Sequence, residues 1–309
     1  MKIVVTGALG HIGSRLIREL PFLFPGSAIV MVDNMITQRY CSLFDLPAEG
    51  NYRFIEADVT KMDLQTLLED ADVVVHLAAM TDAAGSFGHA DELEQNNFNA
   101  TKRIAEACAG YNTRLIALSS TSVYGTQASV VDEDCTEDEL KPQSPYATTK
   151  LREERLVQQL CNERGLEAVI FRFGTIFGTS PGMRFHTAVN RFCWQAVMGQ
   201  PLTVWKTAYE QKRPYLDLSD AVRAVAFVIE NSLFDGEIYN VVTVNVTVRG
   251  VVEHIRQHVP QVDVHFVNNQ IMNQLSYEVL NTRMTNAGFH VQGDIGEGIA
   301  TTVELLMGG

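Results

Sequence analysis

The sequence lacks the features that define several common classes of protein. No apolar run reaches the roughly 18–20 residues that a membrane-spanning helix needs. Basic residues are in the minority, since 24 Lys and Arg stand against 37 Asp and Glu and the formal net charge is −13. No basic cluster with interleaved aromatic side chains occurs. The composition therefore argues against nucleic-acid binding and against attachment to an anionic membrane.

Cysteine is also scarce, and no metal-binding pattern is found. The five cysteines are odd in number and lack the spacing of a metal site or a redox pair: Cys41, Cys108, Cys135, Cys161 and Cys193. The eight histidines include no His-Glu-x-x-His sequence. We expect free thiols in a reducing cytoplasm and no metal site. An apolar run that begins at Lys2 leaves no room for a signal peptide in this sequence, which also favours the cytoplasm.

The first 172 residues contain a regular alternation of apolar runs and helical patterns. The runs predict strands at Lys2–Val5, Ala28–Val32, Tyr52–Glu56, Val73–Leu77, Arg114–Ser119 and Ala168–Phe171. Helical spacing predicts helices at Gly10–Leu20, Met62–Leu68, Asn96–Ala109 and Tyr146–Asn162. This alternation predicts an α/β fold, a Rossmann-type doubly wound parallel sheet with helices on both faces.

A glycine-rich turn follows the first predicted strand and opens the first predicted helix. It runs Thr6-Gly7-Ala8-Leu9-Gly10-His11-Ile12-Gly13. Glycines let the backbone approach a pyrophosphate, and the helix N-terminus offers N–H groups to the phosphates. Asp33 ends the second apolar run, where a carboxylate hydrogen-bonds the adenosine ribose diol and repels a 2′-phosphate. The pattern predicts NAD as the cofactor rather than NADP.

The candidate catalytic residues are Tyr146 and Lys150, which are four residues apart. On a helix this spacing places both on one face, and Pro145 suits the start of that helix. A lysine ammonium one turn away, together with a cationic nicotinamide, favours the phenolate and so makes Tyr146 a general acid/base for a carbon-bound hydroxyl. The run Ser119–Ser122 follows a predicted strand, and a hydroxyl there can hold the reacting oxygen.

These motifs resemble, in their order along the chain, the extended short-chain dehydrogenase/reductase family in its nucleotide-sugar epimerase/dehydratase branch, typified by UDP-glucose/galactose 4-epimerases. The matching segments are Thr6–Gly13, Val32–Asn34, Ala57–Val59, His76–Ala79, Asn96-Asn97, Ser119–Gly125 and Pro142–Lys150. The resemblance assigns catalysis to Ser120, Tyr146 and Lys150. It implies NAD contacts at Gly7, Gly10, His11, Ile12, Gly13, Asp33, Asn34, Asp58, Val59, Leu77, Ala78, Ala79, Asn97, Ser119, Tyr146, Lys150 and Phe173.

The resemblance continues into the second half of the chain. Leu202–Trp205 looks like a segment that lines a nucleotide base, and Arg213 resembles an arginine that clamps a diphosphate. Arg184 and His186 either reach a substrate phosphate or sugar from their loop, or belong to a surface loop with one salt bridge. The substrate contacts that we expect are Thr81, Thr121, Thr175, Arg184, His186, Val204 and Arg213.

Three positions depart from the family pattern. Thr175 stands where an Asn often binds the sugar-nucleotide phosphate, and Pro214 replaces the aspartate after the clamp arginine. Lys206–Glu210 replaces a Gly-Asp-Gly turn. These departures bear on the choice of substrate.

The chain divides at about residue 172. Beyond it, Gly, Pro, Thr and aromatic residues become frequent, a helix is predicted at Asp217–Asn231 and a strand at Glu237–Val242, and Val262–Asn286 is expected to be irregular. We expect residues 1–172 to form an NAD-binding domain with return segments near 214–242. Residues 173–309 are expected to form mainly a substrate-binding domain.

The residues beside Ser120 favour one reaction of the branch. Thr121 and Ser122 cannot replace the acidic residues that dehydratases and decarboxylases carry there. The sequence therefore predicts an NAD-dependent epimerase that acts on a nucleotide-sugar through hydride transfer and a keto intermediate.

Three alternatives to the epimerase are an NAD-dependent dehydrogenase of a small hydroxy substrate, similar to threonine dehydrogenases, a nucleotide-sugar dehydratase, and a cofactor-sensing binding protein. The last is disfavoured because Tyr146 and Lys150 are both present. The resemblance also implies a homodimer formed through the helices predicted at Asn96–Ala109 and Tyr146–Asn162.

Overall fold

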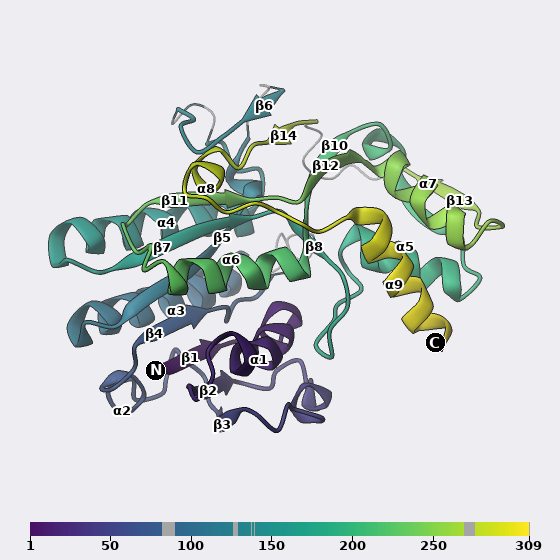
Figure 1. Cartoon of the computed structure of the whole chain (residues 1–309). Helices are drawn as coiled ribbons and strands as arrows, with labels where there is room; N and C mark the ends of the chain where they lie inside the picture. The colour runs from purple at the N-terminus through teal and green to yellow at the C-terminus, as the bar shows by residue number, and fades with distance from the viewer. Residues whose placement is uncertain (82–89, 126–128, 137, 139, 269–275, 309) are drawn as a thin grey trace.

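Figure 1 shows the chain as a computed structural model, in which a large sheet between two layers of helices is joined to a smaller lobe that carries the C-terminus. The structure describes residues 1–81, 90–125, 129–136, 138, 140–268 and 276–308.

The large sheet has seven strands in the order β11-β7-β5-β4-β1-β2-β3, and each neighbouring pair is parallel. This confirms the predicted doubly wound parallel sheet. The strands are β1 Lys2–Thr6, β2 Ala28–Asp33, β3 Asn51–Glu56, β4 Val73–His76, β5 Arg114–Ser120, β7 Ala168–Phe173 and β11 Ile238–Val241. The strand order reverses between β1 and β4, and ligands of such sheets bind beyond the carboxyl ends of the strands at this point.

Helices cover both faces of this sheet (Figure 1). One layer holds α1 His11–Leu23 and α6 Leu218–Glu230, and the other holds α2 Gln65–Leu68, α3 Ala90–Tyr111 and α4 Pro145–Arg164. Successive residues of β1 alternate between the two layers, since Ile3 and Val5 pack with Leu16 of α1 whereas Val4 packs with Ile104 of α3. Burial on both faces explains why β1, β2 and β4 appear in the sequence as nearly continuous apolar runs.

The smaller lobe is built from residues that follow β7. Its sheets are β8 Thr175–Phe177, β10 Lys212–Asp217 and β12 Val244–Thr247 in the order β12-β10-β8, and the pair β9 Leu202–Trp205 with β13 Val264–Val267. Its helices are α5 Ala188–Val197, α7 Val248–His258 and α9 Ile295–Met307. Phe192, Val251 and Ile299 from these three helices share one apolar core.

The remaining elements are short and lie between the larger ones. They are the pair β6 Val130–Val131 and β14 Glu278–Val279, the helix α8 Thr282–Asn286, and the 3₁₀ turns η1 Tyr40–Leu43, η3 Thr121–Val123 and η4 Lys206–Ala208.

Two predicted elements need correction. The stretch Val262–Asn286 was expected to be irregular, but it contains β13, β14 and α8, while residues 269–275 lie outside the described part of the chain. The hydrogen bonds of β13 come from β9, far away in the sequence, so no local pattern marks it. The central helix begins at Ala90 rather than at Asn96, because its first turns are polar and carry no apolar spacing.

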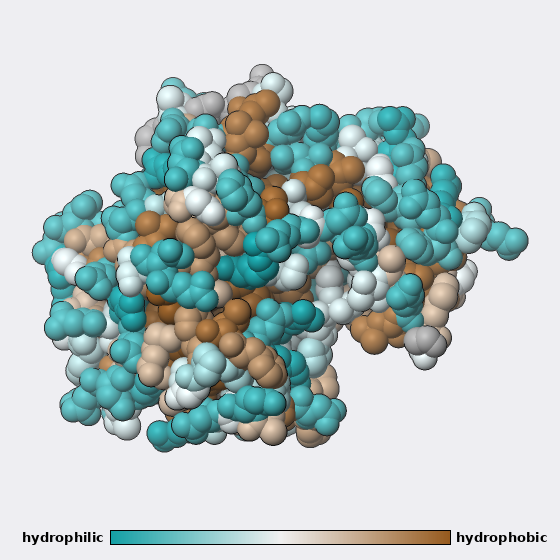
Figure 2. Space-filling model, viewed as in Figure 1, coloured by the Kyte–Doolittle hydropathy of each residue, from teal (hydrophilic) through white to brown (hydrophobic). Residues whose placement is uncertain are grey.

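Figure 2 shows hydrophilic residues on both the sheet domain and the lobe, with the hydrophobic residues of this face in separate groups. Among the helices of the described residues, none combines the length and the hydropathy needed to cross a bilayer. The same part of the chain holds no group of three His, Cys, Asp or Glu side chains arranged to bind a metal ion.

Candidate active site

The glycine-rich turn between β1 and α1 is packed so closely that only glycine fits. Gly7 has a φ of +66°, and a Cβ there would lie 2.7 Å from the backbone N of Ala78. A Cβ on Gly13 would lie 2.5 Å from the Gly7 carbonyl oxygen. Gly10 is the N-cap of α1 and offers no capping side chain. The residues therefore fit a cofactor pyrophosphate, because backbone N–H groups at a helix N-terminus lie open beside a tight turn.

His11 and Ile12 form the first turn of α1 and point to different surroundings. The His11 ring Nε2 lies 2.8 Å from the carbonyl oxygen of Gly178. Burial lowers the pKa of His11 to about 4, so the ring is neutral at physiological pH. Ile12 packs at the edge of the core beneath α1. The His11 side chain thus holds the loop after β8 in place. The backbone N–H groups of the glycine turn are then the part of this segment that can bind a cofactor.

Asp33 ends β2 directly beside the glycine turn. Its Oδ2 accepts from the Leu9 N–H at 3.1 Å and its Oδ1 accepts from the Met35 N–H at 3.0 Å. Each carboxylate oxygen can accept a further hydrogen bond, so the group is fixed in place and still able to hold a ribose diol. Asn34 is exposed and its Oδ1 accepts from the Ile36 N–H at 3.2 Å.

Asp58 lies just after β3, at the same edge of the sheet as Asp33. The Ala57 N–H donates to the Asp33 carbonyl oxygen at 2.9 Å, which links the two segments. Burial raises the pKa of Asp58, but hydrogen bonds from Thr60 and the charge of Lys61 outweigh it and hold that pKa below its ordinary value. The carboxylate is therefore ionised and can accept from an adenine amino group. Val59 is buried in the core beneath the strands.

The segment Leu77–Ala79 continues β4 past the glycine turn. The Leu77 N–H donates to the Thr6 carbonyl oxygen at 3.0 Å, and the Ala78 N–H to Thr6 Oγ1 at 3.4 Å. Asn97 of α3 holds the next residue, since its carboxamide donates to the Met80 carbonyl and accepts from the Met80 N–H, both at 2.8 Å. Asn97 thus positions this segment by its side chain.

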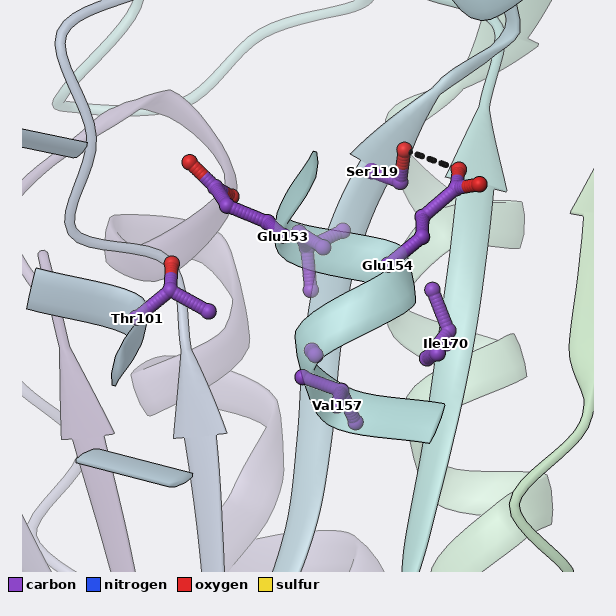
Figure 3. A pocket seen from close by; sticks show the side chains of 8 residues that line it. Thr101, Ser119, Glu153, Glu154, Val157 and Ile170 are labelled. Carbon is purple, nitrogen blue, oxygen red and sulfur yellow. Dashed lines mark hydrogen bonds between the residues drawn. The ribbon is translucent and has the colours of Figure 1, made fainter. Parts of the chain in front are cut away.

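The two serines at the end of β5 point in different directions. Ser119 is buried and its hydroxyl donates to Glu154 Oε1 (Figure 3). Ser120 is partly exposed, and its hydroxyl oxygen accepts from the Ser122 N–H at 3.2 Å and caps η3. The strand alternation therefore leaves the Ser120 hydroxyl for a ligand and commits that of Ser119 to the protein interior.

Tyr146 and Lys150 lie on the first turns of α4. Ser144 caps this helix by accepting from the Ala147 N–H at 3.2 Å, and Pro145 occupies its first turn. The Lys150 Nζ lies 5.9 Å from the centre of the Tyr146 ring. It donates to the Leu118 carbonyl oxygen at 2.9 Å, which fixes α4 to the end of β5 close to Ser120. The structure thus gathers the three predicted catalytic residues where β5 and α4 meet.

The electrostatics around the tyrosine are set by buried charges. Burial is the largest influence on Tyr146 and raises its pKa; Lys150 and Arg184 lower that pKa and Glu153 raises it, and the balance leaves it above its ordinary value. Burial also lowers the pKa of Lys150, but Glu153 and Tyr146 outweigh this and hold that pKa above its ordinary value. Lys150 is therefore an ammonium throughout the physiological range.

Two carboxylates, Glu153 and Glu154, follow Lys150 on α4 (Figure 3). Glu154 pairs with Arg172 of β7 through two hydrogen bonds of 2.9 Å and 2.7 Å. Glu153 pairs with Lys150, its Oε2 lying 2.8 Å from Nζ. Both line a cavity of only about 10 Å³, next to Thr101 and Ser119, which is far too small to admit a sugar.

The predicted substrate residues near the sheet lie where β7 passes into the lobe. Thr121 Oγ1 donates to the carbonyl oxygen of Phe173 at 3.4 Å, and Phe173 ends β7 with a buried side chain. Thr175 begins β8 and is partly exposed. The chain therefore passes from β7 to β8 beside the end of β5, so Thr121 and Thr175 lie in the same region.

The loop that follows β8 covers the glycine turn. The Gly182 N–H donates to Ser14 Oγ at 2.9 Å, and Ser180 Oγ donates to the His11 carbonyl oxygen at 2.8 Å. Arg184 Nη1 donates to Thr81 Oγ1, and the charge of Arg184 acts on both His11 and Tyr146. Arg184 therefore lies between the turn and Tyr146, whereas His186 of the same loop is exposed.

The lobe places the last two predicted substrate residues differently. Val204 of β9 is 1% exposed and its side chain packs in the lobe core, so only its backbone can face a ligand. Arg213 of β10 is partly buried and donates to Gln211 Oε1 at 2.7 Å. Burial lowers the pKa of Arg213, and Tyr277 and Tyr215 lie near its guanidinium.

Three residues of this region were missed by the sequence analysis. Arg39 lies beside Asp33 and close to Gly10, but its loop carries no pattern. Gly182 contacts Ser14, just after the glycine turn, and the two residues are too far apart in the sequence for a local pattern to link them. Glu153 follows Lys150 by three residues, a helical spacing that predicts the ion pair and could have been used.

Comparisons with known proteins agree with this geometry. The profile of the NAD dependent epimerase/dehydratase family matches residues 3–242. An uncharacterized UDP-glucose epimerase, YtcB of Bacillus subtilis, is 34% identical over 248 residues, which are 78% of this chain and 76% of that protein. The crystal structure of UDP-glucuronic acid 4-epimerase from Bacillus cereus, in complex with UDP-glucuronic acid and NAD, has a TM-score of 0.87 at 26% identity and covers 99% of both chains.

Relatives with a different reaction also match. A trifunctional enzyme of Arabidopsis thaliana, whose activities include UDP-glucose 4,6-dehydratase, is 27% identical over 98% of this chain, which spans 47% of that longer protein.

The fold and the relatives show that the chain is an NAD-dependent enzyme of the sugar-nucleotide epimerase and dehydratase type. This class is the extended branch of the short-chain dehydrogenases/reductases. It belongs to the NAD dependent epimerase/dehydratase family, and its cofactor is NAD.

Proposed function

We propose that this enzyme is a UDP-sugar 4-epimerase with Tyr146, Lys150 and Ser120 as its catalytic residues. The observation that carries the proposal is the position of Lys150, which lies over the Tyr146 ring and is hydrogen-bonded to Leu118, two residues before Ser120. UDP-sugar epimerases among the relatives, including one crystallised with UDP-glucuronic acid and NAD, support the substrate class.

The proposed mechanism assigns one proton transfer to each half of the reaction. The glycine turn and Asp33 would hold NAD, which would supply a reversible hydride acceptor for the sugar carbon. Tyr146, whose ionised form would be favoured by the Lys150 ammonium and by a cationic nicotinamide, removes the proton from the sugar hydroxyl. The Ser120 hydroxyl donates a hydrogen bond to the same oxygen and stabilises the negative charge that develops there. Tyr146 then returns its proton to the oxygen of the inverted centre.

The carboxylates of this region favour epimerisation over dehydration. A dehydratase needs a further acid/base beside the catalytic serine, and Thr121 and Ser122 stand there. The two acids behind α4 do not replace it, because Glu154 is bound to Arg172 and Glu153 to Lys150. The relatives described above also include no dehydrogenase of small hydroxy compounds.

The proposal is tested by proton NMR of the enzyme with sub-stoichiometric NAD and either UDP-glucose or UDP-glucuronic acid. A new anomeric signal without accumulated NADH is expected. A 4-keto-6-deoxy product, stoichiometric NADH, or no reaction with either sugar would overturn it. Tyr146→Phe should lower kcat by about 10²- to 10⁴-fold and leave the Kd for NAD unchanged. Full turnover by that variant would remove the tyrosine from the mechanism.

We further propose a cytoplasmic homodimer formed through α3 and α4. All five cysteines are free, which supports a reducing compartment. Arg152 of α4 pairs with Glu94 of α3 and stacks 4.5 Å above the Phe98 ring, so the two helices present one continuous outer surface. Light scattering should give twice the chain mass, and a monomer mass at micromolar concentration would contradict the dimer.

A further inference from the structure

Glu153 is a buried carboxylate that the proposed mechanism does not use. It is 4% exposed, and its Oε2 lies 2.8 Å from the Lys150 Nζ. Its Oε1 is closed to solvent and has no hydrogen-bond partner among the described residues. In Figure 3 the Glu154 carboxylate points to Ser119, whereas Glu153 extends from the same turn of α4 toward the side of Thr101. Burying a carboxylate in this way costs desolvation free energy, which is offset only when the charge has a well-placed ion-pair partner.

The hydrogen bonds of Lys150 show what the carboxylate does. An ammonium has three N–H donors in a fixed tetrahedral arrangement. The Leu118 carbonyl oxygen and Glu153 Oε2 accept two of them. The direction of the third donor is then determined, and a lysine with four rotatable bonds is held in one conformation. Leu118 alone would leave the ammonium free to turn about a single hydrogen bond.

The charge of Glu153 also acts on the tyrosine. Lys150 and Arg184 favour the Tyr146 phenolate, and Glu153 opposes it. Around Lys150 the other groups are Glu154, which is paired with Arg172, and His76, which burial keeps neutral because its pKa falls to about 3. Glu153 is therefore the carboxylate, among the described groups, that pairs with Lys150 itself, whereas Glu154 pairs with Arg172.

We infer that Glu153 is a positioning residue that fixes the Lys150 ammonium in one orientation and moderates the electrostatic field which that ammonium exerts on the Tyr146 hydroxyl. The inference rests on the proposed role of Tyr146 and Lys150. Glu153 touches neither substrate nor cofactor, since the cavity beside it holds only about 10 Å³. Its effect reaches the reaction through Lys150.

The first test is a phenolate titration of the NAD-bound enzyme by ultraviolet difference spectroscopy, with Tyr146→Phe as the blank that isolates Tyr146. Glu153→Gln keeps the size and an acceptor oxygen but removes the charge, so the midpoint for Tyr146 should fall by about one pH unit. Glu153→Asp keeps the charge and should stay near the wild-type midpoint. Glu163→Gln removes one negative charge from the exposed end of α4 and is the matched control, with no expected shift.

The second test is the pH profile of kcat/KM with the UDP-sugar that reacts. Both limbs should move to lower pH in Glu153→Gln, because the base ionises earlier and Lys150 loses the carboxylate that favours its charge. Glu153→Ala also removes the acceptor, and should weaken NAD binding several-fold where Glu153→Gln does not. This second variant keeps the inference testable if one substitution fails to fold.

The outcomes separate this inference from the proposed function. Unshifted titration and unshifted profiles in a folded Glu153→Gln enzyme would overturn the inference and leave the catalytic roles intact. Turnover by Tyr146→Phe would overturn the catalytic roles themselves. A shift as large in Glu163→Gln would show that overall charge, rather than the Lys150 contact, moves the midpoint.

Discussion

The backbone N–H of Gly182 donates to the hydroxyl of Ser14 over 2.9 Å, and so ties a loop of the second half of the chain to the first turns of α1. The approach is so close that a Cβ on Gly182 would lie 2.3 Å from the Leu9 carbonyl oxygen and 2.5 Å from that of Gly10. The loop therefore lies directly on the turn that we expect to hold the NAD pyrophosphate.

Gly182→Ala should displace this loop and weaken NAD binding. The added methyl group must push backbone atoms apart, so the free energy of unfolding should fall by about 1–3 kcal/mol. The Kd for NAD, measured by calorimetry, should rise at least several-fold. Gly110→Ala is the control, because nothing lies within 4 Å of its Cβ and it is in α3, where alanine is favoured. Equal NAD affinity in both variants would show that the loop does not contribute to the cofactor site.

Arg184→Ala should raise the KM for the UDP-sugar by several-fold with a smaller effect on kcat. The guanidinium donates to Thr81 and its charge acts on Tyr146, so it lies close to the proposed general acid/base. Steady-state kinetics with the sugar that reacts provide the measurement, and Arg184→Lys should restore part of the affinity. Unchanged kinetics would assign Arg184 to the loop contact alone.

Asp33 should make NADP bind at least tenfold more weakly than NAD. Its carboxylate is fixed by two backbone N–H groups at the end of β2, where a 2′-phosphate would meet a negative charge. Asp33→Asn should reduce the preference for NAD over NADP. It removes the carboxylate that repels the 2′-phosphate and leaves the guanidinium of the nearby Arg39. Calorimetric titration of both cofactors is the measurement. Equal affinities in the unaltered enzyme would contradict the role of the ribose diol.

Acid should destabilise the fold partly through His11. Its pKa is about 4 in the folded state and about 6.5 when unfolded, so the unfolded chain takes up the proton first. The stabilisation is present above about pH 6.5 and is lost as the pH falls toward 4. Between about pH 7 and pH 5 this amounts to roughly 2 kcal/mol.

Urea unfolding of His11→Gln at the two pH values provides the test. Glutamine keeps a donor for the Gly178 carbonyl but does not titrate, so the variant should lose less stability on acidification than the unaltered protein. Identical losses would mean that the imidazole is protonated without cost in the folded state.

The sequence predicted the large sheet well because each of its strands carries its own signal. Burial on both faces of a parallel sheet selects Val and Ile at successive positions, as in β1 and β4. The strands of the lobe are partly buried and take their partners from distant segments, as β9 does with β13. Their local patterns are therefore weak, and the stretch Val262–Asn286 was wrongly expected to be irregular.

In the candidate site, too, the residues of local motifs could be predicted, but the directions of their side chains could not. The glycines, Asp33, Tyr146 and Lys150 lie in short motifs whose spacing reflects one turn or one helix, and the structure brings them to the carboxyl edge of the sheet. The direction of a side chain is not encoded in such motifs. Only the structure shows that Ser119 turns toward Glu154 and that the Val204 side chain enters the lobe core.

The strand β11 has a consequence for how the enzyme folds. It pairs with β7 at the edge of the large sheet, but the chain passes through β8, α5, β9 and β10 of the lobe and through α6 before it reaches β11. A ribosome-bound chain that has emerged only to residue 173 therefore exposes the whole open edge of β7, which is a surface for mispairing with other chains. We expect the lobe and the sheet to fold as one cooperative unit, and a fragment cut between them to aggregate rather than to yield an independent cofactor-binding domain.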